Sequence, residues 1–231
     1  MNWWTRILDF ISPRQCVMCG SRLSPTERSI CSVCMLHLPR TGFQYNPTEN
    51  IMAQAFWHLT PVERAAALFY FTPHSEVAQI VYELKYANRP DIGEDMGRLM
   101  ATELQAARFF DGIDVLLPMP LARNRLRQRG YNQSEMLAVG ISQLTGIPVV
   151  SHAVSRKPFV ESQTHLSHLE RRENVEHIFT LRNDNLLRHR HVLIVDDVCT
   201  TGATITALSD SIRHVEGIRM SVLTLGYTKF V

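Results

Sequence analysis

The sequence has no long apolar run and very little lysine. A membrane-spanning helix needs about 20 successive apolar residues, and charged residues interrupt every hydrophobic stretch of this chain. Charged residues make up 20% of it and glycine and proline number 11 each, which excludes disordered and collagen-like classes. A net charge of +2 predicts no bulk attraction to nucleic acid or membranes. We therefore expect a soluble, cytoplasmic, globular protein with no transmembrane segment.

Arginine takes the place of the missing lysine. Only Lys85, Lys157 and Lys229 are lysines among the 24 basic residues. Residues 121–190 hold 11 basic against 6 acidic residues, so one part of a nearly neutral chain is basic. A planar guanidinium binds phosphate through two parallel hydrogen bonds, and this composition therefore indicates phosphate as a ligand.

The N-terminal residues 1–11 are apolar with a helical spacing that includes Trp3, Trp4, Ile7 and Leu8. Arg6 and Asp9 interrupt them and no small-residue cleavage site follows, so we do not interpret them as a signal peptide. They predict a short amphipathic helix. Docking onto the chain's own domain is favoured, and contact with a membrane surface or a partner is the alternative.

Four of the five cysteines form two Cys-x-x-Cys pairs, Cys16 with Cys19 and Cys31 with Cys34. Each pair presents two sulfurs on one side of a tight turn, and four thiolates complete the tetrahedron that Zn²⁺ prefers. Disulfides and reduced bystander cysteines are the alternatives, and the lack of a secretory signal disfavours disulfides. We expect a closed structural zinc site with no open position for catalysis.

The chain divides near residue 50 in our interpretation. Polar and turn-forming residues at 38–50 are typical of a linker between a zinc-binding module at 1–45 and a larger domain at 50–231. In the larger part, strands are expected at 65–71, 115–117, 147–150, 192–195 and 218–225, and helices at 75–86, 91–107, 132–145 and 203–215. This alternation predicts an α/β fold in which helices cover both faces of a parallel sheet.

The strongest chemical pattern follows the expected strand at 192–195. Asp196 and Asp197 come directly after four apolar residues, and residues 200–204 read Thr-Thr-Gly-Ala-Thr. Ligands of open α/β sheets bind beyond the carboxyl ends of the strands. Two adjacent carboxylates there need a metal, arginines or hydroxyl donors, and the vicinal hydroxyls of a ribose suit both. Hydroxyls and backbone N–H groups at the start of a helix form a phosphate cradle, whereas ordinary capping explains only one threonine.

Residues 192–204 resemble the phosphoribosyl-pyrophosphate (PRPP) signature of type I phosphoribosyltransferases. Three further stretches resemble one branch of that superfamily, the ComF-type competence proteins: Glu-Leu-Lys-Tyr at 83–86, the arginine-rich stretch at 118–133 that begins Pro-Met-Pro-Leu, and residues 163–175. With the cysteine pairs, the resemblance covers nearly the whole chain. The family commonly has His-Pro where this chain has Ala122-Arg123, so no role of that histidine carries over.

The resemblance implies roles for individual residues. Asp196 and Asp197 would hold the 2- and 3-hydroxyls of the ribose of PRPP. The 5-phosphate would bind to Thr200, Thr201, Gly202, Ala203 and Thr204. Pyrophosphate would bind near Arg123, Arg125, Arg127 and Arg129. Lys85, which could also be a surface residue, is a further candidate for the PRPP site. Arg171 and Arg172 are either part of an ordinary charged helical face or candidates for a mobile cover.

The arginines occupy alternate positions behind Pro118 and Pro120. Because a helical face would split alternate residues and each proline disfavours helix at the residue before it, we expect a shaped loop here. We expect two of the four arginines to touch pyrophosphate and the others to be exposed.

The function implied by the resemblance is transfer of phosphoribose from PRPP to a nucleobase or related nitrogen acceptor, with release of pyrophosphate. Mg²⁺ would bridge pyrophosphate and the ribose hydroxyls. The family also implies a link to DNA uptake, natural competence and the use of nucleotides. The alternative is a non-catalytic protein in which the same pocket senses PRPP or a nucleotide. In that case the zinc module would bind a protein of the competence machinery or DNA, although its scattered arginines do not predict DNA contact.

Overall fold

The computed structural model describes residues 14–157 and 178–228. A parallel sheet of four strands lies at its centre, in the order β1-β6-β5-β2. The strands are β1 (Val62–Tyr70), β2 (Val115–Pro118), β5 (His191–Cys199) and β6 (Arg219–Tyr227). Long runs of each strand are fully buried, as expected for a parallel sheet that is covered on both sides. The expected N-terminal helix, Arg171 and Arg172 lie outside the described residues.

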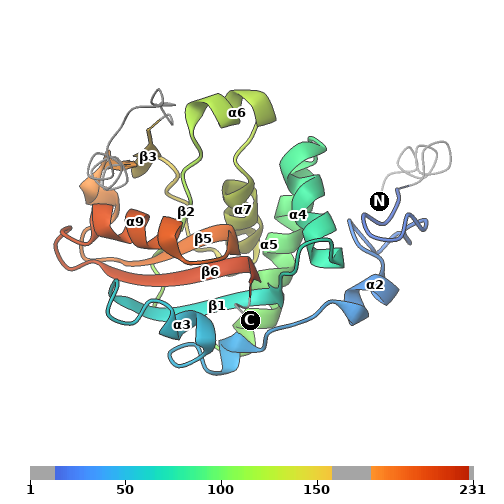
Figure 1. The fold of residues 1–231 in the computed structure, drawn as a ribbon, viewed down its shortest axis with the longest axis horizontal. Helices are drawn as coiled ribbons and strands as arrows, with labels where there is room; N and C mark the ends of the chain where they lie inside the picture. Colours follow the sequence, from blue (N-terminus) through green and yellow to red (C-terminus); the bar gives the residue numbers. More distant parts are fainter. Residues whose placement is uncertain (1–13, 158–177, 229–231) are drawn as a thin grey trace, which may run out of the picture.

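Helices cover both faces of the sheet (Figure 1). One face carries α5 (Pro90–Gln105) and α7 (Gln133–Thr145), with α4 (Glu76–Tyr86) beside α5. The other face carries α3 (Ile51–Gln54) and α9 (Ala203–Ile212). The expected fold class, a parallel sheet between helical layers behind a four-cysteine cluster, is confirmed. Within the described ranges, none of the helices has the length and hydropathy to cross a membrane.

Helices α5 and α7 pack with their backbones in contact. A Cβ atom on Gly97 would lie 2.1 Å from the carbonyl oxygen of Leu137, and one on Gly140 would lie 2.1 Å from that of Glu94. Only glycine permits this approach. In the first turn of α7, the Asn132 side chain accepts a hydrogen bond from the Ser134 N–H.

The expected strand at 147–150 is reduced to a single bridge between Val149 and Leu116. Its two hydrogen bonds run from the Leu116 N–H to the Pro148 oxygen and from the Val150 N–H to the Leu116 oxygen, each 2.9 Å long. Because Pro148 has no N–H to donate, a longer ladder does not form there. An unexpected antiparallel hairpin follows, formed by β3 (Val154–Arg156) and β4 (Phe179–Leu181).

The remaining elements are short. They are α2 (Ser32–His37), η1 (Phe43–Tyr45), α6 (Arg123–Arg129) and η2 (Asp184–Leu186).

The segment predicted as a linker packs along strand β1. The Thr41 N–H donates to the Leu68 oxygen at 3.0 Å, and the Tyr70 N–H donates to the Pro39 oxygen at 2.8 Å. The buried ring of Phe43 stands edge-on to the ring of Tyr70 at a centroid distance of 5.7 Å. The segment is therefore part of the packed structure, and the domain boundary near residue 50 stays a prediction.

The cysteine-containing region contacts helices α4 and α5. Gln79 of α4 donates from Nε2 to the Val17 oxygen at 2.7 Å. The hydroxyl of Ser29, which is buried, donates to the carboxylate of Asp95 on α5. Polar contacts of this kind hold the region against the same helices that support the candidate site.

Candidate functional site

The four cysteines predicted to bind zinc come together. The Sγ atoms of Cys16, Cys19, Cys31 and Cys34 all lie within 4.8 Å of one another, and those of Cys19 and Cys31 are 3.8 Å apart. A tetrahedron with Zn–S bonds of about 2.3 Å has S–S edges of about 3.8 Å. The donor set and its spacing fit a structural zinc ion that fills all four positions.

Backbone groups support the cluster. The Cys31 N–H lies 3.3 Å from the Cys16 sulfur, and the Cys34 N–H lies 3.5 Å from the Cys31 sulfur. Hydrogen bonds with Ser21 lower the pKa of Cys19 to about 6, whereas burial raises the pKa of Cys34. None of the five cysteines, all of which are described, forms a disulfide. A bound cation would stabilise the crowded thiolates.

The acidic pair lies at the carboxyl end of β5, and both side chains are buried. Asp196 accepts two hydrogen bonds on Oδ1, from the Ser134 hydroxyl at 2.9 Å and from the Asp197 N–H at 2.8 Å. Burial, and then the charge of the neighbouring Asp197, raise the pKa of Asp196 to about 7. The pair therefore carries a charge that the protein only partly compensates, and incoming hydroxyl donors would stabilise it.

A lysine from a distant element supplies the counter-charge. The ammonium of Lys85, in the last turn of α4, lies 2.9 Å from Oδ2 of Asp197. The Lys85 side chain is 26% exposed and that of Asp197 only 7%. The structure thus brings Lys85 to the acidic pair, although Lys85 and Asp197 are 112 positions apart in the sequence.

The stretch predicted to cradle phosphate begins helix α9. Gly202 occupies the cap position with φ of 76°, and a Cβ atom there would lie 2.9 Å from Cε1 of the buried Phe56. Both the positive φ and the close contact require glycine. Thr200, Thr201, Ala203 and Thr204 are exposed beside it. Because the first N–H groups of a helix have no partner within the helix, this turn can bind an anion.

The prediction of a loop for the arginine-rich stretch is wrong, because Arg123–Arg129 forms helix α6. Arginine, leucine and glutamine favour helix, and Gly130 ends the helix in the left-handed conformation. Residues four apart share a helical face, so Arg125 and Arg129 lie on one face and Arg123 and Arg127 on the other. The helix splits the four arginines into two pairs.

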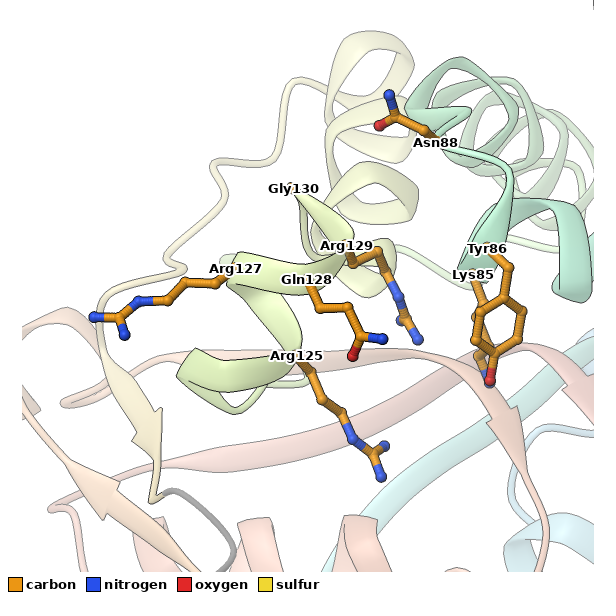
Figure 2. Close-up of a pocket in the computed structure, with 8 residues that line it drawn as sticks. All are labelled: Lys85, Tyr86, Asn88, Arg125, Arg127, Gln128, Arg129 and Gly130. Carbon is orange, nitrogen blue, oxygen red and sulfur yellow. The ribbon is translucent and has the colours of Figure 1, made fainter.

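A cavity of about 720 Å³ lies between α6 and the end of α4. Figure 2 shows the guanidinium groups of Arg125 and Arg129 pointing into the same space, with Lys85 and Tyr86 on the opposite wall. Arg127 also lines the cavity, although its guanidinium points to the other side of α6. The Arg129 guanidinium lies 5.6 Å from the centre of the Tyr86 ring and donates to Gln133. Arg123 is not one of the described residues that line this cavity. Lys85 is common to the cavity and to the acidic pair.

Sequence reasoning missed Arg156, at the end of β3. Its guanidinium lies 5.5 Å from the centre of the Phe179 ring on the paired strand β4. Burial, and then the charge of Arg125, lower the pKa of Arg156, while Asp196 opposes the shift. Arg156 thus lies among the charges of the site, but no motif marks it, because the hairpin that holds it was not predicted.

The chain has curated homologues over most of its length. It is 28% identical over 207 residues to the DNA utilization protein YhgH of Salmonella typhi, which covers 85% of this chain and 89% of that protein. It is 25% identical over 217 residues to competence protein F of Haemophilus influenzae, which covers 90% of this chain and 94% of that protein. These relatives confirm the resemblance to competence proteins. No protein-family model matches the chain.

Among solved structures, the chain aligns with a glutamine PRPP amidotransferase from B. subtilis. It aligns with a TM-score of 0.44 and 19% identity, over 62% of this chain and 30% of that protein.

Proposed function

Because the chain is a homologue of competence and DNA utilization proteins, we propose that it binds PRPP and transfers phosphoribose to a nitrogen acceptor in connection with DNA uptake or the use of nucleotides. One observation carries this proposal: a buried acidic pair at the end of β5 is followed directly by the turn that begins α9, and Lys85 connects the pair to a basic cavity. A ribose that carries a phosphate at one end and a diphosphate at the other matches these three parts.

Each part has a defined task in the proposed reaction. Asp196 and Asp197 accept hydrogen bonds from the ribose hydroxyls, and the N–H groups at the start of α9 hold the 5-phosphate. Arg125, Arg129 and Lys85 bind the diphosphate and stabilise the charge that develops as its C1–O bond breaks, with the bonding electrons leaving on pyrophosphate. The acceptor nitrogen then bonds to C1 and loses its proton. Mg²⁺ that enters with PRPP would supply further positive charge to the leaving group.

The test is calorimetric titration with PRPP, with and without Mg²⁺, followed by measurement of pyrophosphate release with a panel of nucleobases. We expect binding with Mg²⁺, and we expect the double variant Asp196→Asn, Asp197→Asn to lose it while its zinc content is unchanged. Unaltered PRPP affinity in that variant would overturn the site assignment. Release of pyrophosphate with one base would identify that base as the acceptor.

A non-catalytic role is the second candidate, and the names of the relatives favour it, since they describe DNA utilization and competence rather than a transferase. In that role the pocket senses PRPP or a nucleotide, while the zinc region contacts a partner of the uptake machinery. Binding of PRPP without release of pyrophosphate, with every acceptor tested, would support the sensor over the enzyme.

A further inference from the structure

The Lys85 side chain serves two anion-binding places at once. Its ammonium pairs with Oδ2 of Asp197 at 2.9 Å, and the same side chain lines the basic cavity together with Arg125 and Arg129 (Figure 2). A buried carboxylate next to a second carboxylate needs a nearby cation. In the free protein Lys85 meets that need, and its charge is therefore not fully available to an anion in the cavity.

The chemistry of lysine suits an exchange between these two places. A lysine ammonium is a compact charge on a flexible four-carbon stem, whereas an arginine fork is fixed by its planar geometry. Lys85 lies in the last turn of α4 and is 26% exposed, so its ammonium can move without a change in the sheet. Arg129, by contrast, is held by Gln133 and by the ring of Tyr86.

We propose that Lys85 is an exchangeable counter-ion, which pairs with Asp197 in the free protein and moves to the diphosphate when ribose hydroxyls occupy the acidic pair. This inference rests on the proposed function, because PRPP is the ligand that reaches both places. The exchange couples the two halves of the site: the hydroxyls of the ribose release the cation that the diphosphate then binds. A diphosphate that carries no ribose must instead compete with Asp197 for Lys85.

The coupling predicts opposite effects of one substitution on two ligands. Asp197→Asn frees Lys85, so inorganic pyrophosphate should bind about tenfold more tightly, the change typical of gaining one charge-assisted hydrogen bond. The same substitution removes an acceptor for the ribose, so PRPP should bind more weakly. Asp196→Asn is the matched control: it removes a carboxylate at the same place but leaves the ion pair, and it should tighten pyrophosphate binding only about twofold.

A double-mutant cycle isolates the contribution of Lys85. Lys85→Met should weaken pyrophosphate binding about tenfold, and Asp197→Asn in that background should add only the small effect seen for Asp196→Asn. The titrations use inorganic pyrophosphate without divalent cations. Zinc content and melting temperature of each variant establish that it is folded, and Lys85→Arg tests whether a fixed fork can replace the mobile ammonium.

The results of these titrations distinguish a failure of the exchange from a failure of the proposed function. Equal effects of Asp196→Asn and Asp197→Asn on pyrophosphate affinity, additivity in the cycle, or no pyrophosphate binding by any variant would each overturn the exchange. If wild-type protein binds no PRPP but the cycle shows coupling, the proposed function fails and the competition between Asp197 and pyrophosphate for Lys85 stands.

Discussion

The protein gathers groups that can carry negative charge at two places, and their surroundings differ. At the cysteine cluster, four sulfurs lie within 4.8 Å of one another, and backbone N–H groups and the Ser21 hydroxyl are their partners. At the acidic pair, a lysine ammonium, a serine hydroxyl and a backbone N–H already contact the carboxylates. The first place fits a metal ion, whereas at the second the chain itself supplies partners for the carboxylates.

This difference separates a structural site from a site that exchanges ligands. A closed set of four thiolates holds its ion permanently and contributes to folding. A carboxylate pair whose partners include a flexible lysine side chain can give up that partner to an incoming ligand. The predictions below test this contrast, beginning with the place where we expect the larger effect.

Loss of one cysteine ligand should remove the metal. Zinc in small modules contributes about 10 kcal/mol or more of apparent binding energy at neutral pH. Cys16→Ser should therefore reduce zinc from one ion per chain to nearly none, and residues 14–37 should lose hydrogen-exchange protection. Elemental analysis and exchange mass spectrometry measure both effects.

Cys199→Ser is the control, because Cys199 lies at the end of β5 and not in the cluster. It should keep its zinc. A purified wild-type protein that is folded and holds no metal would remove the structural role assigned to the four cysteines.

Near the acidic pair, Arg156, which the sequence did not predict, should matter for ligand binding rather than for folding. Arg156→Gln removes a charge that lies near Asp196 and Arg125, so PRPP affinity should fall about tenfold in the presence of Mg²⁺. The exposed Arg182, on the chain just after β4, offers the control Arg182→Gln, which should leave affinity unchanged. Equal losses of affinity in both variants would show that the loss comes from the overall positive charge and not from the position of Arg156.

The sequence predicted those parts of the site whose members are neighbours along the chain. The two Cys-x-x-Cys pairs, the acids after β5 and the glycine turn are each local patterns with a direct physical meaning. It did not predict the ion pair of Lys85 with Asp197, or the position of Arg156, because both depend on how distant elements pack. The two glycines at the contact of α5 and α7 show this most clearly: no local pattern reveals that Gly97 and Gly140 face one another.

The prediction of a loop for the arginine-rich stretch failed for a different reason. Alternate arginines after two prolines predict a loop, but proline restricts only the residues beside it, and helix α6 begins three residues after Pro120. The expectation that two of the four arginines bind pyrophosphate stays a prediction. Because Arg125 and Arg129 share one face of α6, they are the pair to test.

A third effect concerns the cost of keeping the acidic pair buried. The pKa of Asp196 is raised from 3.8 to about 7 on folding, so the folded protein holds this proton more tightly than the unfolded chain does. The resulting stabilisation is complete below pH 4 and is lost as the pH rises through 7. Asp196→Asn is neutral at every pH and keeps an oxygen that can accept the Ser134 hydrogen bond.

The stability advantage of Asp196→Asn over the wild type should therefore be about 2 kcal/mol larger at pH 8 than at pH 5. This difference corresponds to roughly 4–8 °C in melting temperature. Thermal unfolding of the ligand-free protein at the two pH values measures this gain. Asp210→Asn, at an exposed carboxyl on α9, should show no such dependence on pH. A variant that gains no stability at pH 8 would mean that Lys85 and Ser134 already compensate the pair in full, so that the contrast with the cysteine cluster would be one of ligand type alone.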